Sequence, residues 1–362
     1  MKEKFVKEGY EASVLLVLLA TILVTGVNGL IAFLFFAFFS SVKFGRDPKL
    51  KHGLSSGKSR LGGVAIILSI MIGCCSHVLF NINFNSNLLF SEFDRIFAIS
   101  LIIGMIGLIE DLNQNTSSKA RLVWMMIIVS VFFIIVPALI PSNFLVLNYL
   151  YSNNLAILAL LFTTVMVTGF INAGNIADGA NGLLTSIFFF FFLIAYSLDS
   201  TVFNFSVLIT LLAFIIFNVS TGKIFLGDFG SYSLSALVAL KSLEIYSEMN
   251  INLFFLASVL VYPCFEITRS LLIRSIRKME LMKPDNNHFH NHINTFILSL
   301  GFSKHTSNSI TGLGIALTTS ILPVILYFFG VSLDSDMWSI FFLFQLIILS
   351  LIYIFFEKKF SR

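Results

Sequence analysis

The strongest constraint in this sequence is its series of long apolar stretches. One of them, residues 183–198, contains the five consecutive phenylalanines 188–192 and no charged residue. A helix needs about 20 apolar residues to cross the hydrocarbon core of a membrane. The chain is therefore predicted to be an all-α polytopic integral membrane protein. Its eleven expected transmembrane helices lie at 13–40, 62–82, 93–110, 122–140, 155–172, 183–199, 203–220, 230–246, 251–273, 309–330 and 337–356.

Composition supports this prediction. The chain is 57% hydrophobic and 12% charged, whereas soluble domains carry about 25% charged residues. That balance excludes a soluble enzyme, a disordered chain and a nucleic-acid-binding domain, so the expected surroundings are the lipid bilayer. Residues 1–362 are interpreted as one transmembrane catalytic domain with a cytoplasmic loop at about 274–308. All three cysteines lie in apolar stretches, which indicates neither a disulfide framework nor a zinc site.

The distribution of basic residues predicts the orientation of the helices. Most of the 23 Lys and Arg residues fall in the loops that follow the odd-numbered expected spans, or at the adjoining helix ends. The positive-inside rule makes that side cytoplasmic. The basic residues at 2–7 argue against this orientation, but they are outnumbered.

Polar residues collect in a few segments, and all of these are expected at the same cytoplasmic side. Carboxylates at Asp111, Asp178 and Asp228 provide the oxygen ligands that a hard divalent cation prefers. Gly-rich stretches beside them let backbone N–H groups approach a phosphate. Such a combination suits a reaction between two phosphate-bearing molecules, whose charges must be neutralised before they meet. The segments are 47–63, 110–121, 172–183, 222–231 and 283–292.

Two of these segments resemble a known family. Asn172-x-x-Asn175-x-x-Asp178-Gly179 and Gly222-Lys223-x-Phe225-x-Gly227-Asp228 are similar to motifs of the polyprenyl-phosphate N-acetylhexosamine-1-phosphate transferases. Glu110-Asp111 with Lys119 stands where that family has an Asp pair followed by a lysine, and Asp285-x-x-His288-x-His290 resembles its histidine segment. The resemblance covers about residues 40–295.

The resemblance implies an Mg²⁺-dependent phosphoglycosyltransferase, with Mn²⁺ as a substitute ion. It would act in the bacterial inner membrane with its site facing the cytoplasm. The implied substrates are a UDP-N-acetylhexosamine and undecaprenyl phosphate, and the implied products are UMP and a sugar-diphospho-lipid that starts a wall polymer, an O-antigen or another surface glycan. Whether the chain is a monomer or a homodimer is left open.

The resemblance also implies roles for individual residues. In this reading Mg²⁺ bridges the nucleotide diphosphate and Asp228, while Asp111 positions the lipid phosphate or completes its deprotonation; a covalent route stays open. The histidines are expected on an extended backbone that points both rings to one face. The catalytic residues would be Asp111, Glu110, Lys119, Asp178, His288 and His290; the cofactor- and substrate-binding residues Asn172, Asn175, Asn181, Lys223, Arg277 and Asp285; and the metal ligands Asp228, Asn175 and Asp178.

The sequence departs from the family pattern in places, and two other functions stay open. Glu110 replaces an aspartate, and Asn291 stands where a third histidine is usual. The first alternative is the phospho-MurNAc-pentapeptide transferase of peptidoglycan synthesis, whose triple-histidine segment this chain lacks. The second is a transporter or flippase of an anionic lipid or nucleotide. Transporters bind substrate near the bilayer midplane, where the expected spans here are almost free of ionisable groups.

Overall fold

The computed structural model describes residues 2–46, 58–80, 92–113, 116–141, 149–150, 155–249, 251–280 and 287–360. The expected all-α class is confirmed, since these residues form helices and contain no β-strand beyond isolated bridges. The elements are α1 (Lys2–Ser41), α2 (Gly62–Phe80), α3 (Glu92–Asn113), α4 (Ser118–Ile135), the short 3₁₀ helix η2 (Pro137–Leu139), α6 (Ala156–Ala177), α7 (Leu183–Leu198), α8 (Val202–Thr221), α9 (Gly227–Glu248), α10 (Leu253–Val259), α11 (Val261–Ile276), α12 (Phe289–Ser299), α13 (Lys304–Phe328) and α14 (Met337–Phe360).

Each of the eleven expected spans coincides with a helix or a helix pair, but fewer of them have the length and apolarity of a membrane span. Within the described residues seven helices qualify, or eight if α10 and α11 form one span bent by 84°. The remaining expected spans are α2, α7 and α9. The apolar part of α2 is Gly62–Cys75, and α7 is apolar over its whole length, Leu183–Leu198. Both are shorter than the helices that qualify as membrane spans. The sequence of α9 is rich in serine and includes Lys241 and Glu244.

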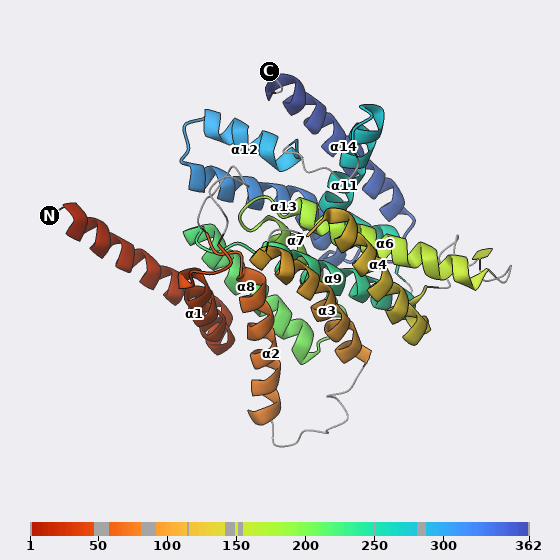
Figure 1. Ribbon diagram of the computed structural model, residues 1–362, viewed down its shortest axis with the longest axis horizontal. Coiled ribbons are helices and arrows are strands. Elements are labelled where there is room, and N and C mark those ends of the chain that lie inside the picture. The colour runs from red at the N-terminus through yellow and green to blue at the C-terminus, as the bar shows by residue number, and fades with distance from the viewer. Residues whose placement is uncertain are drawn as a thin grey trace.

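Helix α9 can be polar because other helices surround it. It packs against α2, α3, α6 and α7, and Figure 1 shows it in the middle of the bundle. Most of its side chains are buried in protein, so this helix does not need an apolar surface toward lipid. Several of its serines donate to carbonyl groups of the preceding helical turn, as when the Ser233 hydroxyl donates to the Phe229 carbonyl at 2.7 Å, whereas the buried Ser235 hydroxyl has no hydrogen-bond partner among the described residues.

Glycines let two helices approach the N-terminal end of α9 closely. A Cβ on Gly63 of α2 would lie 2.1 Å from the Cα of Gly230, and one on Gly107 of α3 would lie 2.2 Å from the Asp228 carbonyl oxygen. Small residues permit such backbone contacts between membrane helices. They fix the position of α9 relative to α2 and α3, and therefore also the position of Asp228.

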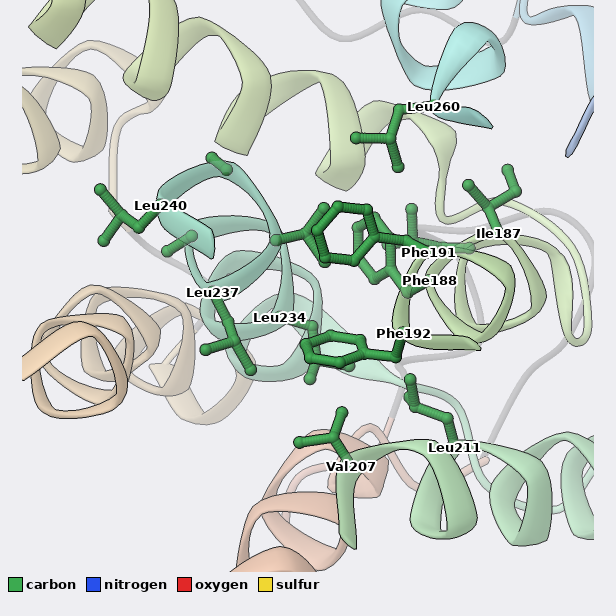
Figure 2. Close-up of a cluster of buried hydrophobic side chains, with 14 of the residues drawn as sticks. Ile187, Phe188, Phe191, Phe192, Val207, Leu211, Leu234, Leu237, Leu240 and Leu260 are labelled. Carbon is green, nitrogen blue, oxygen red and sulfur yellow. The ribbon is translucent and has the colours of Figure 1, made fainter. Parts of the chain in front are cut away.

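The phenylalanine run of α7 forms much of the apolar core beside α9. Figure 2 shows Phe191 and Phe192 pointing from α7 toward α9, where Leu234 lies, with Leu211 of α8 on another side. All four side chains are almost fully buried. Burial of this run inside the bundle, rather than against lipid, explains how so short a helix contributes so strongly to the core.

We predict that Gly63→Ala destabilises the protein. The added methyl group would meet the backbone of Gly230, and neither backbone can rotate away as a side chain could. The expected cost is at least about 1 kcal/mol, the lower range for overpacked cores. Gly169→Ala in α6 is the matched control, because a Cβ there meets nothing within 4 Å. Thermal unfolding in detergent should show a lowered Tm for the first variant only; equal Tm values would contradict the close packing.

Candidate functional site

The candidate site is centred on Asp228, the second residue of α9. Gly227 precedes it with a φ of 75°, a left-handed conformation that glycine adopts easily. The Asp228 carboxylate accepts hydrogen bonds from Arg60 at 2.8 Å, from Arg121 at 2.8 Å and from the Asn175 amide at 3.3 Å. Four separate parts of the chain therefore converge on one carboxylate.

Asp111 lies beside Asp228 and caps the same helix. One oxygen of its carboxylate accepts a bond from the Asp228 N–H at 3.0 Å, and the other accepts one from the Phe229 N–H at 2.9 Å. Arg60 adds an ion pair at 3.2 Å. A carboxylate is favoured at a helix N-terminus, where backbone N–H groups are unpaired and the dipole is positive. Asp111 is thus held rigidly by α9, which leaves its carboxylate little freedom.

Asp178 is the least compensated of the three carboxyl groups. It follows the last residue of α6, and among the described residues no hydrogen bond or ion pair reaches its side chain. Burial and, next to it, the negative charge of Asp228 raise the pKa of Asp178 from 3.8 to about 7. Arg60 lowers this pKa, but by less. Perturbed pKa values of this kind concentrate at functional sites.

The donors around Asp228 suit a hard divalent cation in their chemistry. Oxygens are available from Asp228, Asp178 and the Asn175 amide, and oxygen is the ligand that Mg²⁺ prefers. Within the described part of the chain, however, no group of three or more His, Cys, Asp or Glu side chains is arranged as a metal site. Two guanidinium groups occupy the Asp228 carboxylate instead. The predicted metal ligands therefore lie together without forming a ready-made cage.

A second cluster brings the histidines next to the Asn175–Asp178 segment. His290 is buried, and its Nε2 lies where a Cβ on Gly179 would be, at 1.9 Å from that position. Its Nδ1 lies 3.0 Å from the Tyr262 hydroxyl. Burial lowers the pKa of His290 to about 3, so the ring is neutral at physiological pH. A neutral imidazole has one donor and one acceptor nitrogen, and the contact with Tyr262 uses one of them.

The expected extended backbone at the histidines is wrong. Helix α12 begins at Phe289, and His288 is the extended residue just before it. The two rings nevertheless stack, with centroids 5.4 Å apart and planes inclined by 14°. The Nδ1 of His288 lies 2.8 Å from the buried Glu266 carboxylate, whereas His292 turns toward Asn287 at 2.7 Å.

Other predicted residues are placed away from Asp228. Glu110 accepts hydrogen bonds from the backbone and side chain of Thr116, and Lys119 is exposed. The Asn172 amide donates to the Thr168 carbonyl at 2.8 Å. Asn181 is bound to α13, since its N–H donates to Asn308 at 2.7 Å and its amide to Ser309 at 3.2 Å.

Three predicted residues belong to other surroundings. Arg277 pairs with Glu357 of α14 at 2.9 Å, and no contact with the aspartates is found in the described residues. Lys223 lies at the end of a cavity between α1 and α8, and burial lowers its pKa. Asp285 lies outside the described residues.

The sequence reading missed Arg60 and Arg121, which are the closest cations to Asp228. Both stand near basic residues that the positive-inside rule already explained, so their position at a helix end carried no separate signal. Glu266 and Arg269, which pair through a 2.6 Å contact within α11, were also missed. Their signal was available, because charged residues inside an apolar span are rare and mark function or pairing.

Comparison with known proteins concerns the class of protein. Residues 95–246 match the family described as Glycosyl transferase family 4. This match agrees with the predicted resemblance to the polyprenyl-phosphate sugar-1-phosphate transferases, and together with the apolar helices it indicates a multi-pass membrane enzyme of the phosphotransferase class.

Curated relatives extend the similarity beyond that segment. The phospho-N-acetylmuramoyl-pentapeptide-transferase of Shouchella clausii (strain KSM-K16) is 27% identical over 278 residues, which cover 71% of this chain and 83% of the relative. The protein of the same description from Staphylococcus carnosus (strain TM300) is 25% identical over 272 residues, covering 68% of this chain and 82% of the relative.

We predict that Asp178 makes stability depend on pH. Its pKa is about 7 in the folded protein against 3.8 ordinarily, so the folded state binds this proton more tightly than the unfolded chain. The contribution of this group to the free energy of unfolding is complete below about pH 4 and is lost as the pH rises to about 7. The free energy of unfolding of Asp178→Asn, taken relative to the parent, should therefore be at least about 1 kcal/mol higher at pH 8 than at pH 5. One pKa unit corresponds to about 1.4 kcal/mol.

The measurement compares thermal unfolding of the parent and Asp178→Asn between pH 5 and pH 8. Other titrating groups affect both proteins, so only the difference in Tm reports on Asp178. A difference that stays constant with pH would show that the carboxyl group is already compensated.

Proposed function

We propose that this chain transfers N-acetylhexosamine 1-phosphate from a UDP-sugar to undecaprenyl phosphate, releasing UMP. The observation that carries the proposal is the convergence of Asp228, Asn175, Arg60 and Arg121 at one end of α9. These residues belong to, or lie beside, the segments that resemble the transferase motifs. The product would start a lipid-linked cell-surface glycan.

The charges in the site suit two phosphate substrates. A UDP diphosphate brings about two negative charges, and a phosphate monoester adds roughly 1.5 to 2 more. Arg60 and Arg121 are now balanced by Asp228 and Asp111. We propose Mg²⁺, or Mn²⁺ in its place, as the further cation, held by Asp228 with Asn175 and Asp178 beside it. When bound it would supply charge neutralisation at the diphosphate, and it would compete with the arginines for Asp228.

The position of Asp111 favours direct attack by the lipid phosphate over a covalent intermediate. A nucleophilic Asp111 would have to leave two backbone N–H groups and Arg60. The lipid phosphate has a second pKa near 6, so it is largely ionised at pH 7 and needs no strong base. We therefore assign Asp111 the role of fixing α9 and Arg60 around the reacting phosphates.

The location that suits this chemistry is the bacterial inner membrane, with the site at the cytoplasmic side. The basic residues of the site segments support that orientation through the positive-inside rule. Nucleotide sugars would reach the site from the cytoplasm, and the lipid phosphate would reach it at the membrane interface.

A second candidate is phospho-MurNAc-pentapeptide transfer, because the curated relatives carry that description. The sequence His288-Phe289-His290-Asn291 favours a simpler sugar, since Phe289 interrupts the run of three histidines expected for the second candidate and Asn291 stands in place of a third histidine. His292 does not replace it, because this ring bonds to Asn287. The two candidates share the acceptor and differ in the donor.

The first test measures UMP release by purified protein with undecaprenyl phosphate and a panel of donors. We expect release with a UDP-N-acetylhexosamine and none with UDP-MurNAc-pentapeptide; the opposite result would establish the second candidate. Asp228→Asn should abolish release while the protein stays folded, because the central carboxylate charge is lost. If no donor of the panel gives UMP release, transport is the function to pursue.

The second test compares two cations of one segment. Arg121→Ala should lower kcat/KM at least tenfold, which corresponds to about 1.4 kcal/mol, because Arg121 contacts Asp228 at 2.8 Å. Lys119→Ala is the matched control and should change kcat/KM less than threefold, since its side chain is exposed. A larger loss at Lys119 would mean that the lysine of the motif, not Arg121, meets the substrate.

A further inference from the structure

Helix α13 carries three consecutive buried polar residues near its N-terminal end, Ser307, Asn308 and Ser309. We call them the polar turn of α13. The helix as a whole is apolar enough to cross a membrane, and polar side chains in such helices commonly hydrogen-bond to other helices. Successive residues of a helix point about 100° apart, so each of the three side chains can reach a different part of the chain.

Ser307 bonds to the helix that carries the histidines. Its hydroxyl donates to Asn294, whose Oδ1 lies at 2.7 Å and whose carbonyl oxygen lies at 3.0 Å. Asn294 stands four residues after His290 on α12, so the two side chains share one face of that helix. Helices α12 and α13 lie side by side (Figure 1). Ser307 therefore fixes the part of α12 that presents His290.

Asn308 and Ser309 bond to the turn that follows Asp178. The Asn181 N–H donates to the Asn308 Oδ1 at 2.7 Å, and the Asn181 amide donates to the Ser309 hydroxyl at 3.2 Å. The backbones are close as well, because a Cβ on Gly312 would lie 2.0 Å from the Asn181 carbonyl oxygen. The turn between α6 and α7 is thus held to α13 through both its backbone and its side chain.

The Ser309 hydroxyl adds a third segment. It accepts from Asn181 and donates to the Val219 carbonyl at 3.0 Å. Val219 lies in the last turn of α8, shortly before the segment 222–231 that carries Asp228. The polar turn of α13 therefore connects the histidine helix, the Asp178 turn and the chain that leads to Asp228, which are separate in the sequence.

These contacts surround the place where the two clusters of the site meet. The Nε2 of His290 fills the space beside Gly179, the residue next to Asp178. Within the described residues no hydrogen bond joins the side chains of His290 and Asp178, so other groups must set their separation. That separation matters for catalysis, because a misplacement of about 1 Å can lower a rate by about 10²-fold.

We infer that the polar turn of α13 positions His290 and Asp178 relative to one another, and that Asn308 is its central positioning residue. Asn308 acts through the Asn181 backbone, and Ser307 acts through Asn294. The kinetic part of this inference rests on the proposed function, whereas its structural part can be measured without turnover. The competing explanation is that these residues only anchor α13 in the bundle.

The first experiment compares two substitutions at Asn308 with a control on the same helix. Asn308→Ala removes the acceptor of the Asn181 N–H, whereas Asn308→Asp keeps an oxygen there. Ser320→Ala is the matched control, because Ser320 is also buried and donates to the Val259 carbonyl at 2.7 Å, about 18 Å further along the helix at 1.5 Å per residue.

We expect kcat/KM, at equal amounts of folded protein, to fall at least tenfold in Asn308→Ala. It should stay within threefold of the parent in Asn308→Asp and within twofold in Ser320→Ala. Equal losses in Asn308→Ala and Ser320→Ala would support the anchoring explanation and overturn the inference. A loss in Asn308→Asp as large as that in Asn308→Ala would overturn the assignment to the Asn181 N–H.

The second experiment measures how well His290 is held in place. Diethyl pyrocarbonate modifies neutral imidazoles, and mass spectrometry of peptides gives the rate at each histidine. His290 is 4% exposed, so it should react slowly in the parent. The rate should rise at least fivefold in Asn308→Ala and stay within twofold in Ser320→Ala. Ser307→Ala, which loosens α12 alone, should show the same rise and keeps the test decisive if Asn308→Ala folds poorly.

An unchanged rate at His290 in both Asn308→Ala and Ser307→Ala would overturn the inference, and so would an equal rise in Ser320→Ala. The result is independent of the proposed reaction. If the parent releases no UMP with any donor while His290 reacts as expected, the proposed function fails and the positioning contacts stand.

Discussion

The arrangement of the site depends on the capping of α9 by Asp111. A helix that starts inside a protein leaves N–H groups without partners, and an unpaired buried N–H is costly. Asp111 supplies both oxygens to the first turn and at the same time pairs with Arg60. Without that carboxylate, the first N–H groups of α9 would lose their acceptor and Arg60 would lose one of its two carboxylate partners, so Asp228 would be held less firmly. A residue predicted to act on substrate is therefore also part of the framework.

Helix α9 also shows how much of the fold could be predicted from the sequence. Apolar length located the helices that carry the aspartate and asparagine segments, because burial in lipid or protein requires the same residues along most of a span. It did not locate α12, which carries His290. It could not tell α9, which is enclosed by other helices, from a helix that faces lipid. For the same reason, apolar length could not show that α7 is enclosed, with its phenylalanines buried against α9 (Figure 2). Enclosure is a property of the packed bundle, and no single stretch of sequence contains it.

Within the site, proximity was predictable for residues whose segments pack together through backbone contacts. Asn175 and Asp228 stand in motifs with glycines, and they meet at 3.3 Å. Proximity was not predictable where it depends on the face of a helix or on a distant partner. Lys119 and Arg121 are two positions apart on α4, about 200° around a helix, so only one can reach Asp228. Asn181 was drawn to α13 by Asn308, a partner far away in sequence.

The segment 222–231 connects the two chemistries that a transferase of this class must join. Its first residues border a cavity between α1 and α8, and its later residues present Asp228 among arginines. The structure keeps this segment in place through the Ser59 contacts on one side and Asn218 on the other, whose amide donates to the Ile224 carbonyl at 2.6 Å. A water-soluble donor and a membrane-embedded acceptor cannot share one solvent. On the proposed function, the donor and the acceptor must therefore meet at a helix end, and Asp228 with its two arginines stands at such an end.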